Sequence, residues 1–492
     1  MTWDYGWLVR YLSVLLVGSL AACAPAEKSP AALRMALAQA PLTLDPRYAT
    51  DAASERVNRL IYRQLVDFDA HFRPVPALAH WQCADALHCR FTLEQAGRTF
   101  HDGTRLSAQD VVATYRSLLT LKDSPHSAEF ANIAQIEAID DNTVDFILHQ
   151  PDAQFPARLI VGILPARLIA SQHDFAHHPV GSGPLRLVEW KQVLKLERTA
   201  DHQMITLEEV RDPTVRVLKL LRGEADLLQG DLPPELVAHL KGQRNVTVQE
   251  ASGVNFSYLG FNLQDPLLKD VQVRRAVALS IDREAIIRNA LVGGTRPAAS
   301  ILPPEHWADN PSLKPIEYDP QQAKVLLQQA GVALPLKLVL KTSTDAQRVR
   351  LATIMQAQMK QAGIYLEIRS LDWGTYFDDI KHGKFQLYGL TWVGIKTPEI
   401  YRLAFHSRMI PPAGANRGRL QDAQLDKLIE QQDWQAAMAR IHELLPYAPL
   451  WYEGQFAAMC KGLHGYGLAP DGNWDGLATV TKFNENNQTS AR

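Results

Sequence analysis

The amino-acid sequence predicts an α/β protein divided into two or three lobes, and three observations support this. The chain has 492 residues, well above the roughly 100–200 residues of one ordinary domain. Its composition, 46% hydrophobic and 21% charged, is typical of a globular protein with a large core. Amphipathic helix patterns also alternate with strand-like runs in the second half of the chain, as they do in α/β units.

Two segments carry this alternation. Residues 319–332, "DPQQAKVLLQQAGV", have the apolar spacing of an amphipathic helix that ends at a glycine. Residues 346–373, "AQRVRLATIMQAQMKQAGIYLEIRSLDW", repeat the pattern and continue into a strand-like run. The runs at 337–345 and 365–373 therefore predict parallel strands around the intervening helix.

The charge balance excludes one class of partner. The formal net charge is −2, whereas a nucleic-acid-binding protein needs a basic excess to neutralise phosphates. We therefore expect no nucleic-acid partner. No internal stretch approaches the roughly 20 consecutive apolar residues of a membrane span.

The N-terminus predicts export. Arg10 precedes an apolar run from Tyr11 to Leu20, which is too short to span a bilayer but suits the core of a signal peptide. The run ends in "LAAC", which matches the bacterial lipobox and makes Cys23 the expected lipidation site. We therefore expect a lipoprotein signal peptide at 1–22 and a polar tether at 23–32. A simple secretory signal that happens to contain a cysteine is the alternative.

Export makes a disulfide plausible between two of the four cysteines. Cys83 and Cys89 lie in "WQCADALHCRFTL", which contains two strand-like segments joined by a turn. Cysteines on neighbouring strands can satisfy disulfide geometry, and exported proteins retain such bonds. A metal site is the alternative, but His88 alone does not complete a ligand set. We expect Cys460 to be a small buried hydrophobe.

The stretch "RTFHDGTRLSAQDVV", residues 98–112, brings His101, Asp102 and Ser107 close together in sequence. These residue types suggest a hydrolase. However, Asp102 suits the turn "HDGT", and Ser107, three residues before Asp110, suits a helix cap. A strand, a turn and a capped helix therefore explain the stretch without chemistry, and we expect no catalytic residue.

A second group of candidates is the histidine-rich stretch "SQHDFAHHPVGSG". His173, His177 and His178 could bind a metal, because histidine is a common metal ligand. The proline and glycines that follow favour a solvated loop instead. We therefore predict no metal site and no cofactor.

Several segments, in order along the chain, resemble one family. "FHDGTRLSAQDVV" resembles a signature of the family 5 extracellular solute-binding proteins of ABC importers, the group that contains dipeptide, oligopeptide, nickel and haem binders. Further segments resemble other parts of the same family, and the matches extend over roughly residues 33–480. These segments are "LTLDPRYATD" (42–51), "GSGPLRLVEW" (181–190), "VNFSYLGFNLQDPLLKDVQVRRAVALSIDREAII" (254–287) and "LPYAPLWYE" (445–453).

The resemblance implies a two-lobe periplasmic binding protein fold of the large, three-part type, with a ligand cleft between the lobes. Residues 33–69, 181–263 and 465–485 would form a discontinuous lobe I, residues 70–180 an insert subdomain, and residues 264–464 lobe II. The lobes would close around the ligand about a hinge.

The resemblance also implies a binding role without catalysis. The expected function is to capture a peptide or peptide-like solute and deliver it to ABC permease subunits that work with a cytoplasmic ATPase. We expect a monomer in the cell envelope, facing the periplasm and anchored to a membrane at Cys23. Inner- and outer-membrane anchoring both stay open.

The sequence departs from the family's peptide-binding pattern, which bears on the ligand class. Peptide-binding relatives carry an aspartate in a segment resembling "WxGDYPDP", where it pairs with the ligand's α-ammonium. Here the segment is "WVGIKTPE", and Ile395 occupies the aspartate position. Glu399 is a possible substitute. Lys396 and Arg402 instead favour an anionic ligand, or are solvated surface charges.

The remaining ligand-binding candidates are aromatic and amide side chains of the same half of the chain. Aromatic walls suit a ligand cleft, although core packing is the alternative for several of these residues. One group lies on a strand that crosses between the lobes in the family, and another lies in the loop "PPAGANRGRL". The candidates are Asn255, Phe256, Tyr258, Trp373, Trp392, Tyr401, Asn416 and Arg417.

Two alternative functions are also compatible with the sequence. The same fold could bind a non-peptide ligand, such as a metal chelate, haem or an anionic small molecule. A function from another class is that of an exported peptide hydrolase, for which the sequence contains neither HExxH nor GxSxG.

Overall fold

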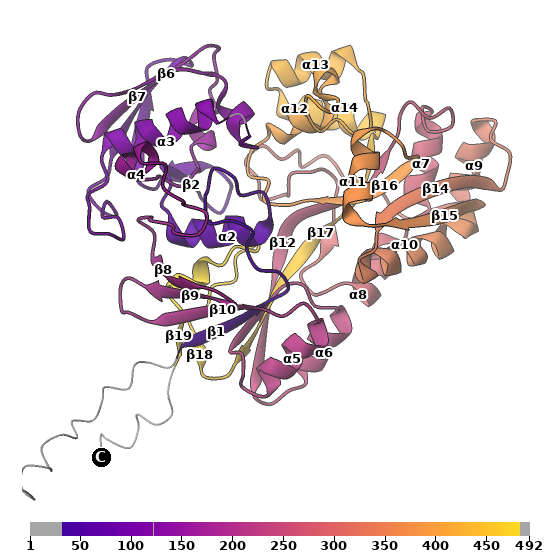
Figure 1. The fold of residues 1–492 in the computed structure, drawn as a ribbon. Helices are drawn as coiled ribbons and strands as arrows, with labels where there is room; N and C mark the ends of the chain where they lie inside the picture. Colours follow the sequence, from indigo (N-terminus) through magenta and orange to yellow (C-terminus); the bar gives the residue numbers. More distant parts are fainter. Residues whose placement is uncertain (1–31, 122, 483–492) are drawn as a thin grey trace, which may run out of the picture.

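The structure, a computed structural model, describes residues 32–121 and 123–482 (Figure 1). The predicted signal peptide, Cys23 and nearly all of the predicted tether lie outside these residues. No helix of the described chain combines the length and apolar character needed to cross a bilayer.

One large sheet connects the two lobes. Its strands follow the order β15-β14-β16-β12-β17-β11-β1-β10-β9-β8, and β13 pairs with β17 outside this path. The two longest strands, β12 (Val246–Phe261) and β17 (Tyr447–Cys460), are antiparallel neighbours at its centre. Figure 1 shows them running from the lower lobe into the right-hand lobe. The pairing is irregular between Ala251 and Asn255, which marks the point where the strands pass between lobes.

Lobe I contains the strands on one side of this crossing. Side chains alternate between the two faces of a strand, and both faces of this sheet are covered: Met35 packs into one cluster, and the next residue, Ala36, packs into another. Its elements are β1 (Leu33–Leu37), α2 (Ala52–Ile61), β8 (Leu185–Trp190), β9 (Val193–Arg198), β10 (Met204–Glu209), α5 (Pro213–Leu221), β11 (Leu227–Gln229), α6 (Pro234–Lys241), β18 (Leu463–His464), η5 (Asp475–Ala478) and β19 (Thr481–Lys482).

The insert forms a separate layer above lobe I (Figure 1). Its four-stranded sheet has the order β4-β5-β7-β6, and α3 packs against it through a cluster that includes Tyr115 and Phe146. Its elements are β2 (Val66–Phe68), β3 (Pro74–Pro76), β4 (Ala79–Cys83), β5 (His88–Leu93), α3 (Ala108–Thr120), η1 (Ser127–Phe130), β6 (Ile133–Ala138), β7 (Thr143–Leu148), η2 (Phe155–Arg158) and α4 (Ala166–Ala170).

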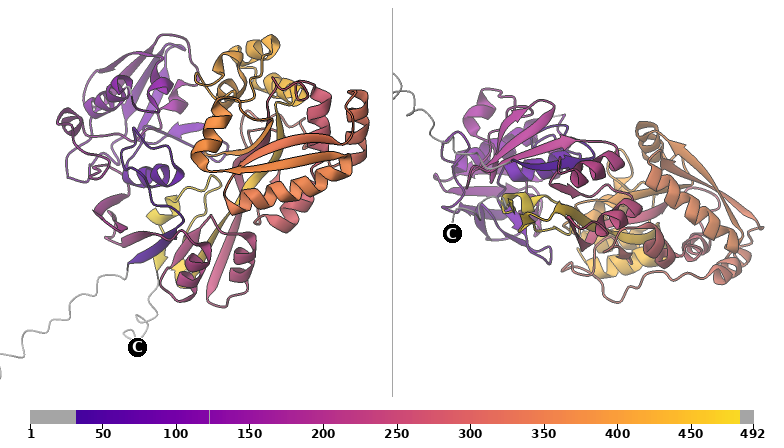
Figure 2. Two further views of the ribbon diagram at one scale, coloured as in Figure 1. Left: turned by 45° about the vertical axis from the view of Figure 1, so that its right-hand side comes forward. Right: turned by 90° about the horizontal axis from the view of Figure 1, so that it is seen from below.

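Lobe II has helices on both faces of its part of the sheet (Figure 2). The strands predicted at 337–345 and 365–373 form as β14 and β15 and pair in parallel, as expected. Its elements are α7 (Val271–Leu279), α8 (Arg283–Ala290), β13 (Arg296–Pro297), α9 (Pro320–Gln329), β14 (Leu336–Ser343), α10 (Ala346–Met359), η3 (Lys360–Ala362), β15 (Ile364–Leu371), α11 (Trp373–Lys381), β16 (Leu387–Trp392), α12 (Ile400–Phe405), η4 (Ser407–Met409), α13 (Ala423–Glu430) and α14 (Trp434–Leu444).

The buried clusters show where residues near the predicted boundaries pack. Leu65 and Val66, placed by the sequence in lobe I, pack into the cluster of the insert. Residues 256–261, also placed in lobe I, contribute to the two clusters of lobe II, because β12 is long enough to run through both lobes. The predicted domain boundaries remain a prediction.

Candidate functional site

The two lobes contact each other at several points. Lys396 of lobe II pairs with Asp471 of the C-terminal segment, with 3.1 Å between Nζ and Oδ2. On α10, Arg350 pairs with Glu235 of α6 at 2.9 Å. The insert contributes a third contact, in which Phe72 stacks on His306 with 5.3 Å between ring centroids. The lobes are therefore closed on each other.

Polar and charged side chains gather where the carboxyl ends of the parallel strands meet the hinge strands. In open α/β sheets this edge is where ligands bind. Asp231 follows β11, Asp345 follows β14, and Trp392 ends β16. We call the following set the interlobe region: Asp231, Asp345, Arg348, Trp392, Lys396, Arg417, Glu453 and Asp471.

Asp231 is the unpaired acid of this region. Among the described residues, its carboxylate has no hydrogen-bond or ion-pair partner, and its backbone has a φ of 55°. The side chain of Asp231 is exposed, but partial desolvation by the surrounding protein raises its pKa, and the negative charges of Glu453 and Asp345 add to the rise, whereas Arg56 and Arg216 oppose it. Asp231 of lobe I therefore lies close to acids of lobe II and has spare capacity to accept hydrogen bonds.

Glu453 of β17 lies at the centre of a polar network on the hinge strands. Its Oε1 accepts the hydroxyls of Ser257 at 2.6 Å and Thr391 at 2.9 Å, and it pairs with Arg348 at 3.0 Å. Burial alone would raise the pKa of Glu453, but the charge of Arg348 and the two hydroxyls lower it. Glu453 is therefore an ionised and already satisfied carboxylate.

Arg417 has a different environment. The guanidinium carbon lies 4.7 Å from the ring centre of Trp392 and 5.4 Å from that of Phe377. Nη1 donates to the hydroxyl of Tyr258 at 3.1 Å. Burial raises the pKa of Tyr376, and the charges of both Arg348 and Arg417 oppose that rise. The two arginines therefore lie near one tyrosine, and Arg417 belongs to the same region as the Glu453 network.

Comparisons with known proteins identify the family. The model for bacterial extracellular solute-binding proteins, family 5 (middle region), matches residues 71–407, which is more than half of the chain. The chain belongs to this family. The resemblance expected from the sequence is therefore confirmed, and the family points to solute binding rather than catalysis.

Curated relatives of this family 5 protein align over nearly its whole length. Di/tripeptide-binding protein 2 of Pseudomonas aeruginosa (strain UCBPP-PA14) is 27% identical over 520 residues, covering 94% of this chain and 97% of the relative. The glutathione-binding protein GsiB of Escherichia coli O157:H7 is 28% identical, covering 87% of this chain and 90% of the relative.

Solved structures confirm the two-lobe fold. The periplasmic binding protein DppA from Helicobacter pylori, in complex with the peptide STSA, superposes with a TM-score of 0.77 at 24% identity, covering 92% of this chain and 98% of that chain. NikZ from Campylobacter jejuni, in complex with Ni(L-His), has a TM-score of 0.77 at 22% identity, covering 92% and 99%. At these identities the likeness establishes the fold alone.

Within the family 5 protein, three charged candidates are already paired. Lys396 pairs with Asp471, as described above. Glu399 accepts from Arg402 Nε at 3.2 Å and lies 3.7 Å from Arg158 of the insert. Ile395, at the expected aspartate position, packs against an apolar cluster of lobe II. These charges therefore neutralise one another within the chain.

The aromatic candidates divide into buried and exposed side chains. Phe256, Tyr258 and Tyr401 are buried in a cluster of lobe II, in agreement with the core-packing alternative. Trp373, at the start of α11, is 59% exposed. Trp392 is partly buried and stacks with Tyr258 at 6.5 Å between ring centroids.

The two amide candidates are buried and hold backbone. Asn255 Oδ1 accepts the backbone N–H of Gly394 at 3.3 Å, which fixes the loop after β16. Asn416 Nδ2 donates to the carbonyls of Leu420 at 2.8 Å and His406 at 3.1 Å. Asn416 therefore shapes the loop that presents Arg417.

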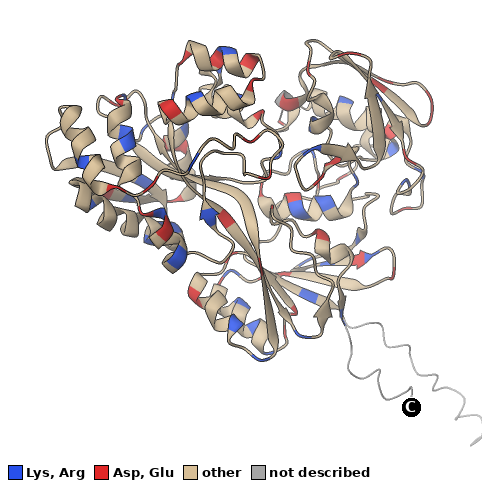
Figure 3. Cartoon of the chain, turned by 180° about the vertical axis from the view of Figure 1, so that it is seen from behind, with Lys and Arg blue, Asp and Glu red and all other residues tan. Residues whose placement is uncertain are grey.

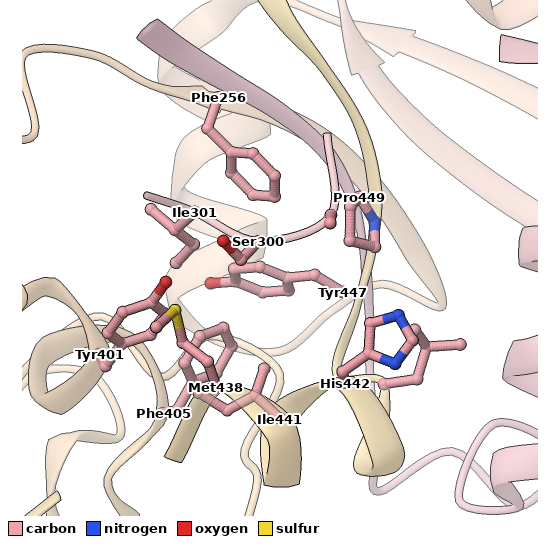
Figure 4. A pocket seen from close by; sticks show the side chains of 12 residues that line it. Phe256, Ser300, Ile301, Tyr401, Phe405, Met438, Ile441, His442, Tyr447 and Pro449 are labelled. Carbon is pink, nitrogen blue, oxygen red and sulfur yellow. The ribbon is translucent and has the colours of Figure 1, made fainter. Parts of the chain in front are cut away.

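Two cavities lie outside the Glu453 network. The first, within lobe II, is lined mainly by apolar side chains, among them Phe256, Tyr401 and Met438 (Figure 4). Its volume of about 20 Å³ suits a single water molecule. The second, of about 290 Å³, lies between the insert and Trp307 of lobe II. The first cavity is too small for a peptide.

The residues that suggested a hydrolase bond elsewhere. The carboxylate of Asp110 accepts the backbone N–H of Ser107 at 2.7 Å and its hydroxyl at 3.0 Å, so the predicted cap is confirmed. His101 Nε2 contacts the carbonyl of Gly183 at 3.0 Å. Asp102 bonds Thr104 at 2.9 Å and pairs with Arg167. The structure therefore does not bring these three residues together as a triad.

The structure also places the two cysteines of the predicted disulfide and the histidines of the stretch 171–183. Cys83 and Cys89 lie opposite each other on β4 and β5 and form the predicted disulfide. His173 Nε2 contacts the carbonyl of His178 at 2.6 Å, and His177 pairs with Asp174 at 2.9 Å. Within the described part of the chain, no group of three or more His, Cys, Asp or Glu side chains is arranged to hold a metal.

Sequence reasoning missed five residues of the interlobe region, namely Asp231, Asp345, Arg348, Glu453 and Asp471. Asp231 and Asp471 lie outside every quoted segment, whereas Asp345, Arg348 and Glu453 lie in or at the end of quoted segments but carried no sign of a site role. The available signal was positional for two of them, because Asp345 ends the strand predicted at 337–345 and Arg348 follows three residues later. Their importance depends on which charges they face across the lobes.

Proposed function

We propose that this protein is the substrate-binding component of an ABC importer, which captures a peptide or peptide-like solute between its lobes and delivers it to the membrane permease. Family membership supports this proposal, and so do the peptide-binding names of its relatives. The carrying observation is that the closed lobes leave an unpaired acid, Asp231, at the edge where the strands of both lobes end.

Asp231 is the group that we assign to the solute's α-ammonium. A buried ammonium needs a carboxylate partner, because an unpaired charge is costly away from water. Glu399, the substitute expected from the sequence, is occupied by Arg402 and Arg158. Asp231 has no such partner among the described residues, and it lies near Glu453 and Asp345, whose negative charges raise its pKa.

The hinge strands supply the closing motion. β12 and β17 connect the lobes through the irregular pairing near Asn255, so the change in backbone angles on opening is concentrated there. Closure brings Asp231 of lobe I toward Glu453 and Asp345 of lobe II, and the ion pair between Lys396 and Asp471 then holds the lobes. The solute is bound by desolvation and hydrogen bonds, without a covalent step.

We also propose where in the cell the protein works and with which partners. We assign residues 1–22 to a lipoprotein signal peptide, Cys23 to the lipid anchor, and the mature protein to a monomer facing the periplasm. The partners are permease subunits with a cytoplasmic ATPase. Positive and negative side chains are interspersed over all three parts of the molecule (Figure 3). The formal net charge of −2 lacks the basic excess that a nucleic-acid partner requires, so we propose no such partner.

A binding experiment with defined peptides tests the proposal. The purified protein is titrated calorimetrically with mixtures of di- and tripeptides, once with free N-termini and once N-acetylated. We expect the free forms to bind and to be recovered intact. Asp231→Asn should lower their affinity about 10- to 100-fold, the range expected for loss of one charged hydrogen-bonded contact.

Asp140→Asn in an exposed turn of the insert is the matched control and should bind like the wild type. Shortened peptides after incubation would instead support the hydrolase alternative. Equal binding of acetylated and free peptides would exclude Asp231 as the ammonium partner. Binding of a metal chelate or haem, with no peptide bound, would assign the protein to the non-peptide alternative.

A further inference from the structure

Arg417 stands apart from the other lobe II cations of this region. Arg348 pairs with Glu453, Lys396 with Asp471 and Arg402 with Glu399. Arg417 has no carboxylate partner among the described residues. Among those residues, the side chain of Arg417 contacts the rings of Trp392 and Phe377 and the hydroxyl of Tyr258.

These neighbours stabilise the positive charge without using up its hydrogen bonds. Aromatic rings attract a guanidinium through their quadrupole, but they accept none of its in-plane N–H bonds. A guanidinium has five N–H donors, and Arg417 uses one of them, toward Tyr258 at 3.1 Å. The group therefore keeps the planar donor pair that matches a carboxylate.

The surroundings of Arg417 are closely packed and hydrogen-bonded. Tyr258 is 1% exposed and stacks on Tyr447 with 3.9 Å between ring centroids. The preceding residue, Asn416, is 1% exposed and bonds Leu420 through both its donor and its acceptor, at 2.8 and 2.9 Å. A binding group held this way loses little entropy when a ligand arrives.

A second unused donor lies beside Arg417. The indole Nε1 of Trp392 is buried and has no hydrogen-bond partner in the described structure, although buried polar groups are normally bonded. Trp392 begins the loop that reaches Lys396, whose side chain contacts Asp471 of lobe I. Arg417 and Trp392 therefore stand at the edge of lobe II that closes onto lobe I.

We propose that Arg417 binds a carboxylate of the solute, so that this protein selects solutes with a free carboxylate group. The inference rests on the proposed function and defines its substrate class. The carboxylate is either the C-terminus of a peptide or the acid group of another small molecule. In both cases its two oxygens accept parallel N–H bonds from the guanidinium, while Trp392 and Phe377 exclude water from one side.

The test compares acids with their amides. The purified protein is titrated calorimetrically with di- and tripeptides that have free C-termini, with the same peptides amidated, and with succinate as a carboxylate without an α-ammonium. Each titration is repeated with Arg417→Gln, with Arg417→Lys, and with Arg408→Gln. Arg408 is a matched control on the same lobe, because its side chain is 82% exposed. Circular dichroism and the thermal midpoint show that each variant is folded.

We expect the wild type and Arg408→Gln to bind free peptides about 10- to 100-fold more tightly than amidated ones, as for a charge-assisted pair. Arg417→Gln should abolish this difference and leave amidated peptides unaffected. Arg417→Lys should keep a smaller difference, because an ammonium cannot form the bidentate pair. Tight binding of succinate that depends on Arg417 would support the carboxylate site with a non-peptide acid as solute.

Two results would overturn the assignment of Arg417, and both can be told apart from a failure of the proposed peptide-binding function. If the wild type binds peptides but does not distinguish acid from amide, or if Arg417→Gln still distinguishes them, the carboxylate is not bound by Arg417 and the peptide function stands. If succinate binds through Arg417 and no peptide binds, the peptide function fails and the carboxylate site stands. If neither class binds, both fail.

Discussion

Lys396 of lobe II and Asp471 of lobe I form an ion pair across the closed lobes, with 3.1 Å between Nζ and Oδ2. Both side chains are largely buried, at 17% and 15% exposed. Burial would raise the pKa of Asp471, but the charge of Lys396 lowers it, and the net direction is downward. The ammonium also lies over the ring of Phe68 at 5.4 Å. The pair therefore contributes to the closed state as long as both partners are present.

We predict that Lys396→Met weakens closure. The substitution leaves Asp471 as a buried acid without its partner, which costs several kcal/mol for fully buried pairs and about 1–2 kcal/mol for a partly exposed pair such as this one. Solute affinity should therefore fall about tenfold, and the radius of gyration measured by small-angle X-ray scattering should increase. Lys191→Met is the control, because Lys191 is 80% exposed and pairs with Glu189 within lobe I. An unchanged radius and affinity would show that the pair does not hold the lobes.

A second prediction concerns pH and His306. In the neutral ring, Nδ1 accepts the backbone N–H of Ala308 at 3.0 Å and Nε2 donates to the carbonyl of Lys396 at 3.1 Å. Burial lowers the pKa of His306 from 6.5 to about 4, and the bond to Lys396 opposes this only partly. The unfolded chain takes up this proton near pH 6.5, before the folded protein does. The stabilisation is therefore complete above pH 6.5 and is lost as pH falls toward 4.

At pH 5 the loss attributable to His306 should be about 2 kcal/mol of unfolding free energy relative to pH 7.5. Denaturant unfolding at both pH values measures it. His306→Gln should remove this part of the pH dependence, whereas His382→Gln, at an exposed position, should retain it. If wild type and His306→Gln lose stability in parallel, burial of the neutral ring is not the cause.

A third prediction addresses the hinge strands at Gly253. A Cβ atom at this position would lie 1.6 Å from the carbonyl oxygen of Glu453 on the neighbouring strand. Gly253→Ala must therefore push β12 and β17 apart and should destabilise the protein by about 3 kcal/mol, as overpacking does in a dense core. Thermal unfolding measures this. Gly389→Ala on β16 is the control, because no atom lies within 4 Å of its added Cβ, and its thermal midpoint should be unchanged. Equal midpoints for the two variants would contradict the close approach.

A fourth prediction concerns the insert. The disulfide between Cys83 and Cys89 closes a loop with a sequence separation of 6, for which the loop-entropy model gives about 2 kcal/mol of stabilisation. Cys83→Ser with Cys89→Ser should therefore make the insert more susceptible to limited proteolysis while solute binding is largely retained. Cys460→Ser is the control, because Cys460 is a free cysteine among the described residues. Protection of the insert equal to that of the wild type would show that its own core is sufficient.

Local sequence patterns predicted a helix, cap or disulfide correctly where all the residues that form it lie within one short segment. The capping box at Ser107 and Asp110 and the glycine-stopped helices of lobe II depend on neighbours within a few residues, so the sequence carries the necessary information. The cross-strand cysteines are a similar case. Residues 256–261 were harder to assign, because β12 continues through both lobes and its partners are far away in sequence.

The candidate site was predicted only in part, and Glu399 and Asp231 show why. The sequence suggested Glu399 as a substitute for the missing aspartate, because it follows the altered segment near Ile395. In the structure, however, its carboxylate lies beside Arg158, a residue of the insert. Asp231 carried no motif, but it is the acid without a partner among the described residues of the interlobe region. Whether a charge is available to a ligand depends on its pairing, and pairing joins distant parts of the chain.

The sequence by itself determined the family, the α/β class, the disulfide and the helix caps. Each of these depends on motif order, apolar periodicity or hydrogen bonds between residues that are close together along the chain. Only the tertiary structure decided which charges are free. Lys396 meets Asp471 and Arg348 meets Glu453, whereas Arg417, within the part of the chain that the structure describes, meets aromatic side chains and no carboxylate. The physical reason is that ion pairing and burial depend on distances in space, which closure of the two lobes sets and sequence spacing does not.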